Sequence, residues 1–131
     1  MQSSFLVDTP GLVISYDADN AWLYCDWRGA HDQDSSQSAC LLMLEALRTQ
    51  PCRKILNDNS GVTRQTMQLS LWGVWWLEEM TKAGLEYVAW VFPRDFATRV
   101  HTEQALAQIA RPVVSSFDDV ASAYLWLRRQ A

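Results

Sequence analysis

The residues best suited to chemistry lie together in the stretch from residue 53 to residue 66, RKILNDNSGVTRQT. After a short apolar run it presents amides, a carboxylate and a hydroxyl before a glycine: Asn57, Asp58, Asn59, Ser60 and Gly61. This segment is either a loop that handles a ligand or a phosphate group, or a turn in which the Asp58 carboxyl group caps the backbone. Asp58 could act as a general base only with a proton donor or metal ion within reach, and the local sequence supplies neither. We therefore predict a polar loop and no catalytic residue.

Other polar side chains follow the remaining expected strands of a parallel sheet. They are Arg28, Arg94, Asp95 and Ser115. Ligands of open parallel sheets bind beyond the carboxyl ends of the strands, so we expect these residues to join residues 57–61 at one edge. Such an edge would suit a polar or anionic ligand. The alternative is that the same side chains only cap turns and bond to the backbone.

Signatures of metal, cofactor or nucleophile chemistry are weak. His31 lies in an HDQD stretch whose spacing matches no known ligand set, so we predict a solvated loop before a helix and no metal site. No phosphate-binding loop, dinucleotide fingerprint or Gly-x-Ser-x-Gly elbow occurs, and no cofactor is predicted. An enzyme would have to use Asp58 with Arg28 or Arg94, and no nucleophile–base pair can be recognised. We therefore predict that the protein is not an enzyme.

Hydrophobic periodicity predicts the elements that must position these residues. Strands are expected at residues 12–17 and 22–27, joined as a hairpin by turn residues 17–20, and further strands at residues 54–56, 87–92 and 113–117. Helices are expected from Ser35 or Ser36 to Thr49, from residue 66 to 83, from Thr98 or Thr102 to Ala110, and from Asp118 onward.

The order ββαβαβαβα predicts an α/β fold. Because helices alternate with strands after the hairpin, we expect a mostly parallel sheet with helical crossovers and an antiparallel N-terminal edge strand. The segment YVAWVF at residues 87–92 is apolar on both faces. Such a run suits a strand covered from both sides. No repeat or linker interrupts the chain, so we expect residues 1–131 to form one domain.

The Trp-rich segment LSLWGVWWLEEM belongs to the helix expected at residues 66–83. On a helical wheel, Trp72 and Trp76 oppose the charged sector and should pack on the sheet. Leu71 and Trp75, four residues apart, fall inside the polar sector. This pair is either buried beneath another element or exposed as an interaction surface.

Composition excludes several classes of function. The chain is 49% hydrophobic and 20% charged, and its net charge is -4. These proportions are those of globular proteins. Without a cluster of Lys or Arg, neither nucleic-acid binding nor attachment to an anionic membrane is expected. No apolar run is long enough for a transmembrane segment, and the N-terminus lacks a secretory signal. Cys25, Cys40 and Cys52 are an odd number of thiols, which we expect to stay reduced in the cytoplasm.

In element order and length, the chain resembles the STAS superfamily and, within it, the SpoIIAA-like group. The founding members are bacterial anti-sigma-factor antagonists, which are switched at a serine in an Asp-Ser-Ser-Gly stretch. The matching residues here, 58–61, put Ser60 at the phosphoacceptor position. Residues 62–66 are mostly polar, so we expect the next helix to begin late and leave Ser60 away from a helix N-terminus, where phosphate is favoured. The segments WLYCDW, LNDN and YVAWVF are similar to those of uncharacterised SpoIIAA-like bacterial proteins.

The resemblance implies a non-enzymatic regulatory or protein-interaction module of the bacterial cytoplasm, with a protein partner or a second copy of itself. The wider fold includes the CRAL-TRIO lipid-binding domains, which implies binding of a lipid or another small hydrophobic ligand as the alternative. The aromatic content offers a site for such a ligand, because five tryptophans either line a cavity between sheet and helices or only fill the core. They are Trp22, Trp27, Trp72, Trp76 and Trp90.

Overall fold

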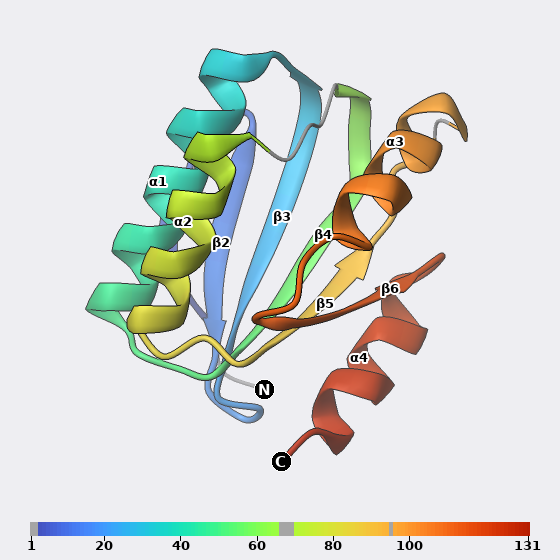
Figure 1. Cartoon of the computed structure of the whole chain (residues 1–131). Helices are drawn as coiled ribbons and strands as arrows, with labels where there is room; N and C mark the ends of the chain where they lie inside the picture. Colours follow the sequence, from blue (N-terminus) through green and yellow to red (C-terminus); the bar gives the residue numbers. More distant parts are fainter. Residues whose placement is uncertain (1–2, 66–69, 95) are drawn as a thin grey trace.

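The computed structural model describes residues 3–65, 70–94 and 96–131. Its elements in chain order are β1 (Ser3–Asp8), β2 (Leu12–Asp17), β3 (Trp22–His31), α1 (Gln33–Thr49), β4 (Lys54–Gln65), α2 (Leu71–Lys82), β5 (Tyr87–Val91), α3 (Phe96–Leu106), β6 (Val113–Phe117) and α4 (Val120–Arg129) (Figure 1). The predicted order is present with one strand added, since β1 precedes the hairpin. β1 was not predicted from the sequence; it pairs with β2 at the edge of the described sheet and leaves Phe5 74% exposed.

The strands lie in the sheet in their order along the chain, from β1 at one edge to β6 at the other. The pairs β1–β2 and β2–β3 are antiparallel, and the pairs β3–β4, β4–β5 and β5–β6 are parallel. Parallel neighbours need a crossover connection, which α1, α2 and α3 supply. The predicted α/β class, with a mostly parallel sheet and an antiparallel N-terminal edge, is confirmed.

Helices cover both faces of the sheet, with α1 and α2 on one face and α4 on the other (Figure 1). Successive residues of a strand point to opposite faces. β4 therefore places Ile55 in the core beneath α1 and α2 and Leu56 in the core beneath α4. On the first face the buried side chains include Leu47 and Met80, and on the second Leu127.

The polar segment at residues 57–61 is not a loop, and this prediction was wrong. β4 runs for 12 residues, from Lys54 to Gln65, and carries the segment inside the sheet. The physical reason is the neighbouring strand, since β3 continues to His31 and its residues from Arg28 onward pair with β4 from Gly61 onward. Backbone pairing with a long neighbour outweighs the local turn preference of Asn, Asp, Ser and Gly.

Helix starts also differ from the prediction. Asp32 caps α1 by accepting a hydrogen bond from the Ser35 backbone N–H at 2.8 Å. Ser35 is therefore the third residue of a capping box and not the cap. Asp119 caps α4 in the same way, accepting from the backbone N–H of Ser122 at 2.8 Å, in place of the predicted Asp118. α2 is capped by Ser70 and starts at Leu71, even later than the late start expected.

Candidate functional site

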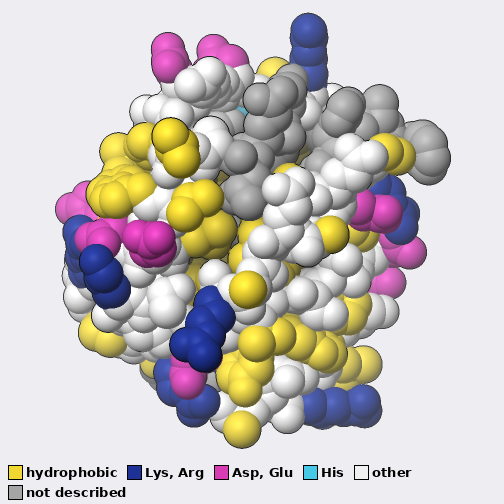
Figure 2. Space-filling model, in the orientation of Figure 1, with side chains coloured by type: hydrophobic (Ala, Val, Ile, Leu, Met, Phe, Trp, Pro, Cys, Tyr) yellow, Lys and Arg dark blue, Asp and Glu magenta, His cyan; other side chains and the backbone are white. Residues whose placement is uncertain are grey.

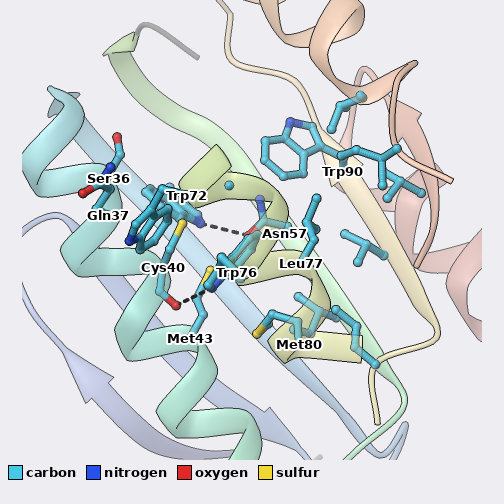
Figure 3. A pocket seen from close by; sticks show the side chains of 18 of the residues that line it. Ser36, Gln37, Cys40, Met43, Asn57, Trp72, Trp76, Leu77, Met80 and Trp90 are labelled. Atoms are coloured by element: carbon cyan, nitrogen blue, oxygen red, sulfur yellow. Dashed lines mark hydrogen bonds between the residues drawn. The ribbon is translucent and has the colours of Figure 1, made fainter. Parts of the chain in front are cut away.

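A cavity of about 390 Å³ lies between the sheet and the helices on the α1/α2 face. Residues of α1, α2 and the sheet line it, together with Leu106 at the end of α3 (Figure 3). Most of the wall is aliphatic or aromatic, with a polar side formed by Ser36 and Gln37 of α1. None of the described residues that line it carries a charged side chain. Small-molecule sites span about 300 to 1,000 Å³ and have apolar walls of this kind.

Four of the five tryptophans named from the sequence line this cavity: Trp27, Trp72, Trp76 and Trp90. Trp22 instead packs against Tyr124 of α4, with ring centroids 5.2 Å apart. Both Trp22 and Trp27 belong to β3, and an odd separation of five positions sends them to opposite faces of the strand. Trp22 therefore fills the core on the α4 face, which is the second of the two alternatives that the sequence left open.

Hydrogen bonds hold two of these rings in place. The Trp76 Nε1–H donates to the Cys40 backbone carbonyl at 2.7 Å and ties α2 to α1. The Trp27 Nε1–H donates to Asn57 Oδ1 at 2.9 Å and ties β3 to β4. The Cys40 side chain is also part of the wall, and burial raises the pKa of its thiol to about 12. A thiol that stays protonated at neutral pH is a poor nucleophile, so Cys40 serves as a lining group.

Asn57 is the residue that sequence reasoning placed in the wrong setting. It is only 1% exposed and faces the cavity from the middle of the sheet. The signal that could have found it is the period of two along β4, because Asn57 is two positions after the core residue Ile55. Within the described chain, its Nδ2 has no hydrogen-bond partner, and the same holds for Trp90 Nε1. Asn59 is also 1% exposed, and neither its side-chain Nδ2 nor its Oδ1 has a hydrogen-bond partner among the described residues.

Asp58 lies on the opposite face of the sheet from Asn57. The Tyr24 hydroxyl donates to its Oδ2 at 2.5 Å, and the Ser60 backbone N–H donates to its Oδ1 at 2.9 Å. Burial and, next, the hydrogen bond to Asp58 raise the pKa of Tyr24 above its ordinary value. Asp58 is 4% exposed, so these contacts form a buried structural pair.

Ser60 and Gly61 continue β4. Ser60 is half-buried and lies ten positions before Ser70, the N-cap of the next described helix. The Gly61 backbone runs so close to β3 that an added Cβ would lie 3.0 Å from the Trp27 carbonyl oxygen. The N-terminus of α2 therefore does not follow Ser60 directly in the chain, and the role of Ser60 as a phosphoacceptor stays a prediction.

Of the polar residues expected at the carboxyl edge, Arg28 lies beside residues 57–61, because it is the register partner of Gly61. Arg28 pairs with Asp26 of its own strand at 2.7 Å. Ser115 lies inside β6, opposite Ala89 in the register, and Arg94 is exposed after β5. Asp95 lies outside the described residues. A shared role for this set at one edge stays a prediction.

His31 is not in a solvated loop, and that prediction was wrong. It ends β3 and is 8% exposed. Its Nε2 lies 3.2 Å from the Gly11 carbonyl oxygen and 3.0 Å from that of Arg28, and its Nδ1 lies 3.1 Å from Ser35 Oγ. The ring thus joins the start of β2 to the end of β3 and the start of α1. In the described residues, no group of three or more His, Cys, Asp or Glu side chains is arranged to hold a metal ion.

The outer side of α2 is exposed. Leu71 is 91% exposed, Trp75 43% and Val74 40%. Hydrophobic side chains gather over α1 and α2 on this side of the molecule, toward the left of Figure 2. Trp75 also contacts Trp72 of the cavity wall, with ring centroids 5.8 Å apart. The pair named from the sequence is exposed, and its use as an interaction surface stays a prediction.

Comparison with known proteins supports the fold. The structure is similar to the crystal structure of an uncharacterised protein of the DUF3478 family with a SpoIIAA-like fold, from Shewanella loihica PV-4. The alignment has a TM-score of 0.51 and 20% identity, and it covers 95% of this chain and 99% of that one. The chain therefore has a SpoIIAA-like fold. No family model matches the sequence and no curated protein matches it. Of the helices described, none has the length and apolar character to cross a membrane.

Proposed function

We propose that this protein is a non-enzymatic binding domain that holds a small, mainly apolar molecule between its sheet and helices α1, α2 and α3. The observation that carries the proposal is the cavity of about 390 Å³ with four tryptophans in its wall. Protein interiors are packed closely and rarely leave a void larger than a water molecule. Tryptophans that served only to fill a core would have closed this space, so ligand binding accounts for it better.

The chemistry of the nearby groups supports binding over catalysis. The Asp58 carboxyl group points away from the cavity and is occupied by Tyr24 and Ser60. The thiol of Cys40 is held protonated by burial. The three cysteines are free thiols. They would stay reduced in a bacterial cytoplasm, which is where we place the protein.

Binding can be tested with a dye and a pair of blocking variants. Native mass spectrometry of the purified protein should detect a bound small molecule, and the neutral dye prodan should bind with a blue shift of its emission. Ser36→Phe puts a ring into the cavity wall, whereas Ser38→Phe puts the same ring on the exposed side of α1. Ser36→Phe should abolish dye binding and Ser38→Phe should leave it unchanged. Equal dye binding by both variants, with no co-purified molecule, would refute the proposal.

A second candidate function is protein interaction through the outer face of α2. It is favoured by the exposure of Leu71, Val74 and Trp75 on one helix, and by a groove of about 430 Å³ beside Val74. Exposed large apolar side chains that gather on one face often mark interfaces. Analytical ultracentrifugation should show self-association that Trp75→Ala weakens and that Leu125→Ala, on α4 and 45% exposed, leaves intact. A wild-type protein that stays monomeric at all concentrations would count against self-association.

A further inference from the structure

We propose that the cavity ligand is an uncharged molecule whose acceptor oxygen binds the side-chain N–H groups of Asn57 and Trp90, an inference that rests on the ligand-binding function proposed above. The two residues are direct partners in the parallel register of β4 and β5. Paired residues on neighbouring strands, which lie about 4.8 Å apart, point to the same face. Both side chains therefore face the cavity next to each other, and both are among its lining residues (Figure 3).

The orientation of the Asn57 amide is set by its neighbour. Its Oδ1 accepts the Trp27 Nε1–H at 2.9 Å. An indole N–H can only donate, so the amide cannot be turned the other way without losing this bond. Nδ2 is consequently held on the side away from Trp27, where no described residue accepts from it.

Trp90 presents a second donor of the same kind. Its Nε1 is buried and, across the described chain, has no acceptor. The other buried indole donors of the wall are occupied, since Trp76 donates to Cys40 and Trp27 to Asn57. Buried N–H groups are almost always hydrogen-bonded in proteins. Two buried donors without a described acceptor, on paired residues of the cavity wall, therefore point to an acceptor that arrives with a ligand.

We assign both donors to one ligand oxygen atom. A carbonyl oxygen has two lone pairs and accepts two hydrogen bonds at once. A ketone, ester or amide oxygen placed between Asn57 and Trp90 fits this requirement. The rest of such a molecule would lie against aliphatic side chains such as Met80 and Val88, which are buried in the same wall.

The uncharged side chains of the cavity wall disfavour an acidic ligand. No described lining residue is charged, so a carboxylate would lose its hydration without gaining a counter-ion. Two neutral N–H donors compensate a neutral carbonyl group more completely than they compensate a full negative charge. The wall therefore favours a neutral carbonyl compound over a fatty acid or another anionic ligand.

Three probes with the same ring test the inference by displacement of prodan from the wild-type protein. 2-Acetylnaphthalene carries the neutral carbonyl group, 2-ethylnaphthalene has nearly the same shape without it, and 2-naphthoate carries the charge. We expect the ketone to bind at least about fivefold more tightly than either of the others, as one or two extra hydrogen bonds would give. Trp90→Phe removes the N–H and keeps an aromatic ring, so it should weaken ketone binding and leave ethylnaphthalene binding unchanged.

The outcomes separate the two proposals. Equal binding of ketone and hydrocarbon would overturn the acceptor inference and leave the ligand-binding function standing. Tightest binding of the carboxylate would overturn the requirement for a neutral ligand. A parallel loss of both neutral probes in Trp90→Phe would show that Trp90 acts through packing alone, which also overturns the inference. Failure of prodan and all three probes to bind would overturn the proposed function together with it.

Discussion

Replacing Tyr24 with phenylalanine tests whether Asp58 belongs to a structural pair on the α4 face of the sheet. The substitution removes the hydroxyl that donates to Asp58 Oδ2 at 2.5 Å, and Asp58 is only 4% exposed. Hydrogen bonds to charged or strongly polar groups contribute about 1.5–3 kcal/mol, so we expect a loss of that size in the free energy of unfolding. In a domain of this size, each kcal/mol lowers Tm by roughly 3–5 °C, which gives a drop of about 5–15 °C.

The dependence on pH makes this prediction specific to the hydroxyl. Burial, and after it the hydrogen bond to Asp58, raises the pKa of Tyr24 above its ordinary 10.0. The folded protein therefore holds the phenol proton more tightly than the unfolded chain does. The resulting stabilisation is complete below about pH 10 and is lost as the pH rises further. The gap in stability between wild type and Tyr24→Phe should be constant at neutral pH and narrow above about pH 10.

Urea denaturation followed by far-UV circular dichroism, from neutral pH to the highest pH at which the protein stays folded, measures this gap. Burial also raises the pKa of Cys25, Cys40 and Cys52, but these thiols affect wild type and variant alike and cancel in the difference. Tyr16→Phe, in a half-buried tyrosine of β2, is the matched control and should show a smaller loss. A loss below about 0.5 kcal/mol at neutral pH, or a gap that does not change with pH, would refute the reasoning. Altered prodan binding by Tyr24→Phe would also contradict the placement of the pair outside the cavity.

Further substitutions test the fold by urea denaturation. In Gly11→Ala the new Cβ would lie 2.9 Å from the His31 ring. Overpacking of this kind should cost about 1–3 kcal/mol, and the cost should shrink in a His31→Ala background. Asp119 is the N-cap of α4. Its loss in Asp119→Ala should cost about 1 kcal/mol. Asp118 forms an exposed ion pair with Arg99, so Asp118→Ala should cost only about 0.5 kcal/mol. A larger loss of stability in Asp118→Ala than in Asp119→Ala would contradict the cap assignment. Met80 is 0% exposed. Met80→Ala should therefore cost about 2–5 kcal/mol, and a loss below about 1 kcal/mol would show that the core beneath α2 is not closely packed.

Hydrophobic periodicity was enough to predict most of the fold. The apolar run YVAWVF became β5, buried from both sides, and the hairpin turn formed where Asp17 accepts the backbone N–H groups of Asp19 and Asn20. These features depend on neighbours in the chain, so local sequence determines them. β1 was missed because an exposed edge strand has a weak apolar pattern.

Part of the candidate site follows from the sequence, and part of it was decided only by the tertiary structure. The chain by itself determined that its tryptophans are concentrated where a cavity wall could form, and the alternation of side chains along a strand is enough to separate Trp22 from Trp27. Only the tertiary structure decided that residues 57–61 are strand and not turn, because β3 runs long enough to pair with them. That pairing places Asn57 beside Trp90 and sends Asp58 to Tyr24 on the other face. The length of β3 and its pairing with β4 join residues far apart in the chain, and local turn preferences at residues 57–61 gave no sign of that partner.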